Sequence, residues 1–183
     1  MTDTHPLPRM PFRVASLPTR KPTRFAFRPD AAQRQALADA LGLIELPAFS
    51  FVGELLPQDR SDFRLTAEMS AEVVQPCVVT LAPVPASLRE AVTRVLLADY
   101  AAPEEDEAEI PEDDSEPLPD EIDVVQVAIE ALTLALPPFP RARGAELGEA
   151  VFGPPGVQAL RQADLNPFPG LASLAERLKE KGE

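Results

Sequence analysis

The chain has 183 residues, a length that suits one domain with a hydrophobic core. Hydrophobic residues make up 45%, which argues against a wholly disordered chain, and 22 prolines argue against a long coiled coil. One cysteine cannot form an internal disulfide, and no apolar run approaches the roughly 20 residues of a membrane span. We therefore expect a soluble, cytoplasmic protein without a membrane partner.

The net charge of −13 is concentrated in one segment. Between Asp99 and Asp123 there are 13 acidic residues and no Lys or Arg, so the rest of the chain holds 17 acidic and 17 basic residues. The N-terminal stretch is the reverse, because between positions 9 and 34 seven cations accompany a single acid, Asp30. Such asymmetry is typical of a chain that contacts a polyelectrolyte or an oppositely charged partner.

The N-terminal part predicts a strand, its extension and a helix. Residues 12–17 alternate apolar and polar side chains, as a half-buried strand does, and 24–27 extend the strand after a Pro-rich connection. Asp30 is an N-cap residue followed by strong helix formers, and Gly42 suits the C′ position. We expect a helix over 30–41.

The middle of the chain predicts consecutive strands. Residues 43–56 are mostly apolar, and 63–72 give the clearest period-two pattern in the chain. The strand pattern continues over 73–81, where Pro76 indicates a bulge or an edge. Residues 84–98 are compatible with a helix or a strand, and we favour a strand because it extends the antiparallel meander.

Residues 99–121 are acidic, contain four prolines and have little apolar surface to bury, so we expect a disordered loop. Beyond this acidic loop, apolar periodicity predicts a helix over 123–136, and Asn166 is placed to cap a last helix over 167–180.

These elements predict an α+β fold. We expect an antiparallel sheet of five or six strands, either open or curled and partly closed, with about three covering helices. The whole chain, 1–183, is expected to be a single domain with a frayed terminus at 1–10 and the acidic loop at 99–121.

Two stretches carry a resemblance to a known family. Residues 73–84 read VVQPCVVTLAPV, and the second stretch has Glu-Ile-Asp at 121–123 and EALTLALPPFPR at 130–141. Separated by an acidic spacer and followed by Asn-Pro-Phe at 166–168, they resemble the YceD family of bacteria and plastids, in the style of its alphaproteobacterial members. The resemblance runs from the first strand to the C-terminal helix and is strongest over 72–141.

The resemblance implies a role in the accumulation of large-subunit ribosomal RNA, and so in assembly of the large ribosomal subunit. It implies this RNA or a pre-ribosomal particle as the partner, and no enzymatic activity or cofactor. Many members carry paired cysteines, at the position of Cys77 and near the C-terminal end. This chain has Thr80 where the second cysteine of the first pair stands, and no later cysteine. A metal site of that kind is therefore not expected here.

Residue chemistry leads to the same expectation of no catalytic, cofactor-binding or metal residue. Zinc usually takes four Cys, His or carboxylate ligands, whereas Cys77 and His5 are the chain's sole cysteine and histidine. We interpret Cys77 as a small, partly buried strand residue. The glycines lack the spacing of phosphate-binding loops, and the acidic run is typical of a solvated, mutually repelling segment.

Exposed cations are the candidate RNA contacts, because Lys and Arg neutralise phosphates and release counterions. An ordinary charged surface is an interpretation of equal weight. Phe25 and Phe27 are compatible with base stacking, although core packing is the better interpretation for at least one of them. The candidate cations are Arg9, Arg13, Arg20, Lys21, Arg24, Arg28, Arg141 and Arg143.

The acidic loop has three interpretations: a solubilising spacer, a site for a basic ribosomal protein before its delivery to RNA, or an autoinhibitor of the basic stretch. The leading functional prediction is a non-catalytic factor for large-subunit RNA accumulation and subunit assembly. The alternative is an interaction module or chaperone for a basic partner. For that alternative the candidate residues are Glu104, Glu105, Asp106, Glu107, Glu109, Glu112, Asp113, Asp114 and Glu116.

Overall fold

The computed structural model describes residues 7–58, 61–100, 115–146 and 148. The chain divides into two units, Met1–Arg143 and Gly144–Glu183, and the first carries every element described below. In chain order these elements are β1 (Pro11–Arg13), the 3-10 helix η1 (Val14–Ser16), β2 (Thr23–Phe27), α1 (Ala31–Leu41), β3 (Glu45–Gln58), β4 (Asp62–Pro76), β5 (Pro83–Leu97), β6 (Ser115–Pro117), β7 (Glu121–Asp123) and α2 (Val124–Ala135).

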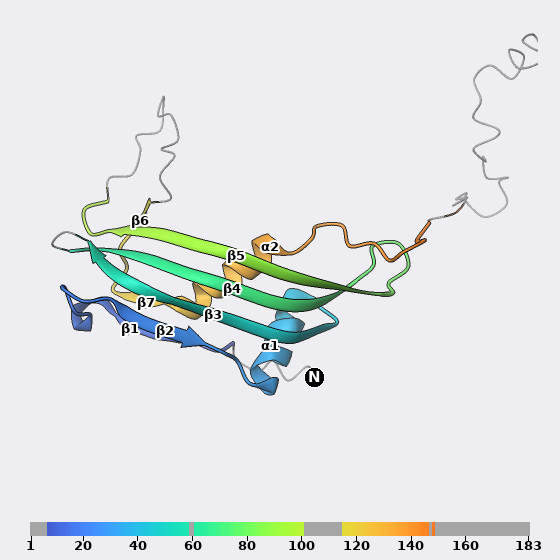
Figure 1. Cartoon of the computed structure of the whole chain (residues 1–183), viewed down its shortest axis with the longest axis horizontal. Helices are drawn as coiled ribbons and strands as arrows, with labels where there is room; N and C mark the ends of the chain where they lie inside the picture. Colours follow the sequence, from blue (N-terminus) through green and yellow to red (C-terminus); the bar gives the residue numbers. More distant parts are fainter. Residues whose placement is uncertain (1–6, 59–60, 101–114, 147, 149–183) are drawn as a thin grey trace, which may run out of the picture. The chain divides into compact units, whose positions relative to one another are not determined.

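Five strands form one sheet in the order β2-β3-β4-β5-β6 (Figure 1). Strands β2 to β5 are an antiparallel meander, whereas β6 lies parallel to β5 and pairs only with Val95–Leu97. Strands β1 and β7 form a separate antiparallel pair that brings Phe12 opposite Ile122. The expected meander is confirmed, and so is the strand expected over 84–98.

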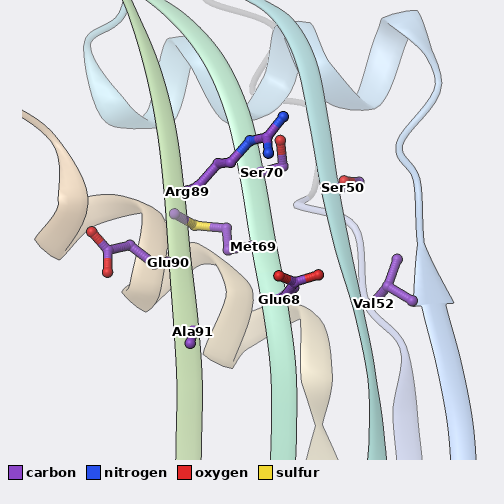
Figure 2. A pocket seen from close by; sticks show the side chains of 8 residues that line it. All are labelled: Ser50, Val52, Glu68, Met69, Ser70, Arg89, Glu90 and Ala91. Carbon is purple, nitrogen blue, oxygen red and sulfur yellow. The ribbon is translucent and has the colours of Figure 1, made fainter.

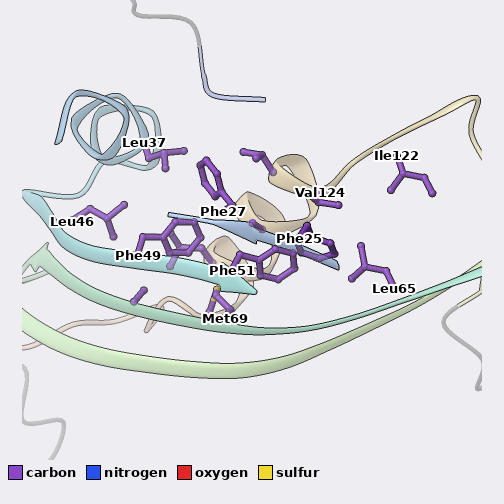
Figure 3. Close-up of a cluster of buried hydrophobic side chains, with 14 of the residues drawn as sticks. Phe25, Phe27, Leu37, Leu46, Phe49, Phe51, Leu65, Met69, Ile122 and Val124 are labelled. Carbon is purple, nitrogen blue, oxygen red and sulfur yellow. The ribbon is translucent and has the colours of Figure 1, made fainter. Parts of the chain in front are cut away.

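Alternation along the strands gives the sheet one packed face and one open face. Alternate side chains of β2, β3 and β4 are buried together against α1 and α2, as a sheet face and two amphipathic helices require (Figure 3). The buried side chains from these three strands include Phe25, Phe27, Phe49, Phe51, Leu55, Phe63, Leu65 and Met69. The residues between them point to the opposite face, where no described element covers the sheet (Figure 2).

Both helices begin at carboxylate caps. Asp30 accepts from the Gln33 backbone N–H at 2.9 Å, and the Gln33 side chain accepts from the Asp30 N–H at 3.0 Å, so α1 has a complete capping box. Gly42 ends α1 with a left-handed φ of 65°, which costs glycine little. Asp123 caps α2 by accepting from Val125 N–H at 3.1 Å. The helices expected over 30–41 and 123–136 are thus confirmed.

The α+β class is confirmed, but its details differ from the expectation. The sheet is mixed rather than wholly antiparallel, and it is not curled into a partly closed form. The described residues contain two α-helices rather than three, and the helix expected over 167–180 lies outside them. The strand expected over 73–81 ends at Pro76, because Cys77 begins a tight turn in which Leu81 N–H donates back to Cys77 C=O at 2.9 Å.

Part of the segment expected to be a loop over 99–121 forms a strand. Residues 115–117 form β6, and Leu118 N–H donates to Leu97 C=O at 2.9 Å. Parallel pairing with β5 compensates the ordering entropy of this short segment, a tertiary contribution that acidic composition does not reveal. Residues 101–114 lie outside the described part of the chain.

Candidate interaction surfaces

Arg9 belongs to a cluster that fastens the N-terminal stretch to β7. Its guanidinium donates to Asp123 at 2.8 Å and to Glu121 at 3.0 Å. Asp123 also accepts from Met10 N–H at 3.0 Å and from Val125 N–H at 3.1 Å. The Asp123 carboxylate therefore fastens the N-terminal stretch and caps α2, and Arg9 has a structural partner within the fold.

The charge state of Asp123 follows from these partners. Burial of its side chain, which is 9% exposed, opposes ionisation. The N–H groups of Met10 and Val125 and the Arg9 guanidinium outweigh burial, and the pKa of Asp123 lies below its usual value. The same contacts raise the pKa of Arg9, chiefly through its hydrogen bond to Asp123.

Four of the predicted RNA-contacting cations gather along the outer strand β2. Arg24 lies on the open face of β2, and its side chain is 85% exposed despite a 3.6 Å ion pair with Glu54. Arg28 directly follows the strand, and Arg20 and Lys21 precede it with Pro22 between; all three cations are exposed. We call Arg20, Lys21, Arg24 and Arg28 the basic edge.

The other predicted cations lie elsewhere. Arg13 is exposed on β1, and its pairing partner there is the acidic Glu121. Arg141 and Arg143 are exposed in the segment after α2, which is fastened to the end of β4 through a hydrogen bond from Val78 N–H to Pro140 C=O at 2.9 Å. The structure therefore divides the eight predicted cations among three places.

The open face carries two cations that the sequence analysis did not select. Arg64 and Arg89 both project from this face, and Figure 2 shows Arg89 extending over Ser70 beside a shallow hollow of about 350 Å³. Arg64 and Arg89 both occupy exposed positions in strands whose exposed and buried residues alternate, and this alternation could have identified them. Phe25 and Phe27, the proposed stacking residues, are both buried in the core at 6% and 5% exposure, so neither is placed for stacking.

Of the predicted acidic residues, Glu104 to Asp114 lie outside the described part of the chain. Glu116 lies in β6 and pairs with Arg94, whose other terminal nitrogen donates to Glu130 on α2 at 3.1 Å. Arg94 is only 26% exposed, so this three-residue link stabilises the attachment of β6 and α2 to β5. Glu116 is therefore engaged within the fold.

The strand order separates the basic and acidic parts of the chain. The basic edge lies along β2, and the acidic segment leaves the sheet after β5 and rejoins it at β6, on the opposite side. Four strand spacings of about 4.8 Å put roughly 19 Å between β2 and β6, which exceeds the Debye length of about 8 Å at physiological salt. Within the sheet, the two charged parts therefore interact weakly.

Cys77 occupies a buried turn. Its side chain is fully buried, whereas we expected partial burial in a strand. The sulfur accepts N–H groups from Val79 at 3.4 Å, Thr80 at 3.5 Å and Ala142 at 3.4 Å. The hydrogen bond from Ala142 N–H lowers the pKa of the thiol most, followed by that from Thr80. Burial raises the pKa, and the resulting pKa of the thiol is about 6. Cys77 thus links the turn to the segment after α2.

Two further findings bear on chemistry. Within the described ranges, no three His, Cys, Asp or Glu side chains gather closely enough to hold a metal ion. Neither α1 nor α2 is long and apolar enough to cross a membrane. His5, the other conceivable ligand considered with Cys77, lies outside the part of the chain that the structure describes.

Comparison with known proteins gives one match. No curated protein and no solved structure matches the chain. A family model described as "Large ribosomal RNA subunit accumulation protein YceD" matches residues 65–175, which is more than half of the chain. The match extends from β4 through β5 and α2, so it includes the part of the core that these elements supply, the buried turn at Cys77 and the acidic segment, but not β2, α1 and β3. The chain therefore belongs to the YceD family.

Proposed function

We propose that this protein is a non-catalytic cytoplasmic factor that supports accumulation of large-subunit ribosomal RNA and assembly of the large ribosomal subunit. The observation that carries the proposal is the family match over residues 65–175, whose description names large-subunit RNA accumulation. In this proposal the protein contacts the RNA or a pre-ribosomal particle directly, through its basic edge.

Three features support the basic edge as the contact surface. Its four cations are exposed, and Arg24 retains an 85% exposed side chain even beside Glu54. They follow one outer strand, so an RNA backbone is able to run along them. They are also four strands away from β6, where the acidic segment rejoins the sheet. A polyanion at β2 is therefore screened from Glu116 in β6.

The charged side chains that are least exposed already have partners within the fold, which agrees with a non-catalytic role. Asp123 is occupied by Arg9 and two backbone N–H groups, and Arg94 by Glu116 and Glu130. These groups hold chain segments together. The fully buried Cys77 sulfur is likewise occupied by three N–H donors.

Deletion of the gene tests the function directly. We expect the ratio of large- to small-subunit ribosomal RNA to fall, and free small subunits to accumulate in sucrose gradients. An intact gene on a plasmid should restore both. An unchanged ratio together with a normal subunit profile would remove the proposal.

The basic edge is tested by replacing Arg20, Lys21, Arg24 and Arg28 with glutamine. Binding to single-stranded ribosomal RNA fragments should weaken, and the slope of log affinity against log salt should decrease by about three if four phosphate contacts are lost. The matched control replaces the exposed Arg141 and Arg143 with glutamine, which should change the slope by less than half as much. Equal effects from both variants would indicate a diffuse electrostatic contact and contradict a role for the basic edge.

A further inference from the structure

We propose that the free edge of β5 binds an extended segment of a basic protein, which adds to the sheet as a further strand. This inference deepens the proposed function, on which it rests, by assigning a second partner and the surface that receives it. Four residues supply the edge, namely Ser87, Arg89, Ala91 and Thr93, and we call them the open β5 edge.

The backbone direction of β5 identifies these four residues. Leu118 N–H donates to Leu97 C=O at 2.9 Å, so the backbone groups of Leu97 point toward β6. On the other side, Ala98 N–H donates to the side chain of Asp62, the first residue of β4, at 2.9 Å. Backbone groups alternate along a strand, so Thr93 and every second residue before it present N–H and C=O groups to the same outer edge as Leu97.

The open β5 edge is bounded at both ends. Toward its start, Pro83 and Pro85 have the same phase, so their nitrogens face outward without a hydrogen atom, and strand addition there is blocked. Toward its end, β6 already pairs in parallel with Val95–Leu97. Among the described residues, no strand pairs with the stretch between them. The outer edge of β5 thus already pairs with β6 at Val95–Leu97, and the four residues of the open β5 edge next to this pairing are available to a further strand.

A groove runs along this edge, between β5 and α2. Residues of β5 and α2 enclose about 600 Å³, and the apolar part of the lining comes from Val92, Ala131, Leu134 and Ala135. Leu134 is 81% exposed, which is unusual for a leucine in a helix that otherwise packs on the core. Side chains alternate along an added strand, so every second side chain of the incoming segment would enter this groove.

The charge around the groove selects a basic segment. Glu90 lines the groove, and at its far end Glu116 and Glu130 share Arg94, which leaves an excess of two negative charges on the groove side of the sheet. Arg89 of the same edge projects from the opposite, open face. The net charge of −13 adds long-range attraction for a cationic partner. A second copy of this chain would bring another −13 and is repelled for the same reason. The favoured segment has apolar residues on the side that enters the groove, with one Lys or Arg on that same side beside Glu90.

A synthetic peptide that binds to the full chain tests the proposal: its groove-facing positions are valine, with one lysine beside Glu90, and its other positions are threonine. We expect the peptide to bind and to slow hydrogen exchange at the four amides of the open β5 edge. Ala91→Pro removes one outward N–H in the phase that Pro83 and Pro85 already occupy, so the β4 ladder is kept. It should weaken the peptide by about tenfold, whereas Ala91→Val, which retains the N–H, should not.

Two further variants separate the groove and the charge from the backbone. Leu134→Ser should weaken the peptide, whereas Phe139→Ser, at a 75% exposed side chain outside the groove lining, should not. Glu90→Lys should weaken the lysine peptide and improve binding of a peptide in which glutamate replaces lysine. Both variants leave the backbone of β5 unchanged, so they still test peptide binding if Ala91→Pro fails to fold.

The proposal is overturned if none of these variants changes peptide binding. It is also overturned if Ala91→Pro instead dissolves a dimer seen by light scattering, or if RNA rather than peptide protects the edge amides. Neither result bears on the ribosomal RNA ratio of the deletion strain. An unchanged ratio with intact peptide binding would conversely remove the proposed function and leave the edge as a peptide site.

Discussion

The two faces of the sheet are made from alternate residues of the same strands, but one face forms the core and the other is exposed. The packed face has Phe51 and Leu65 fully or almost fully buried against two helices, and it fixes the fold. The open face has Ser50, Ser70 and Arg89 in the corresponding rows (Figure 2), and the side chains that join strands there are exposed polar pairs such as Ser87 and Glu72, 2.7 Å apart. The open face is therefore free to change without loss of the fold, and functional contacts are better sought on it and on the sheet edges.

The largest expected difference between the faces comes from neighbouring residues of β3. Phe51→Ala leaves a cavity at a fully buried site and should lower the free energy of unfolding by about 3–5 kcal/mol. Val52→Ala, on the 38% exposed side chain next to it, should cost less than about 1 kcal/mol. Urea denaturation of both variants measures the contrast. Similar losses would show that the open face is covered in the folded protein.

The buried turn at the end of the packed face should be the next most sensitive place. Cys77→Ala leaves three backbone N–H groups without their acceptor and should cost about 1–3 kcal/mol. Cys77→Ser retains an acceptor and should lose less. In the folded protein the thiol should react slowly with Ellman's reagent despite its lowered pKa of about 6, because the sulfur is fully buried. Rapid labelling without unfolding would contradict this packing.

The Arg9–Asp123 cluster should contribute less, and its contribution should depend on pH. Asp123→Asn weakens the cap of α2 and removes the ion pair, at a cost of about 1–2 kcal/mol at pH 7. The pKa of Asp123 is lowered by folding, so the stabilisation is complete above the ordinary Asp pKa of about 3.9 and is lost as the pH falls through the lower folded value. Thermal unfolding of both proteins between pH 7 and pH 2 checks this. Parallel stability curves would exclude Asp123 as the titrating group.

The smallest effect on stability should come from the open face. Arg89→Gln and Arg64→Gln remove exposed side chains and should change the unfolding free energy by no more than about 0.5 kcal/mol. A larger change in RNA affinity than in stability for either variant would extend the RNA surface from the basic edge across the sheet. A larger change in stability would show that these cations have structural partners.

The long strands could be predicted from the sequence because side chains alone encode them. Alternation over 63–72 gives both the strand and the identity of its buried side chains, and Asp30 with Gly42 marks both ends of α1. Strand β6 could not be predicted, because its three residues are stabilised by pairing with β5 rather than by composition.

The candidate surfaces were predictable only in part. Charge counting identified the cations of the basic edge, but it grouped Arg9 with them, since the partner Asp123 is 114 positions away in the sequence. The open β5 edge was invisible, because a backbone edge has no residue signature until the strand order is known. Pro83 and Pro85 are the sequence feature that agrees with this edge, because prolines two residues apart leave two backbone positions without N–H on the same side of the strand. That side can be identified as an outer edge only when the strand order is known.

The pairing of β1 with β7 also has a consequence for the order in which the chain acquires its structure. The meander β2 to β5 consists of neighbours in sequence, so it is able to form once residue 97 has left the ribosome. Residues 11–13, although synthesised first, have no partner until 121–123 emerge. The N-terminal stretch is therefore expected to remain unpaired during synthesis and to close last, when α2 docks. Folding of this protein would thus begin with the meander β2 to β5. Residues 11–13, although synthesised first, would be among the last to reach their folded positions.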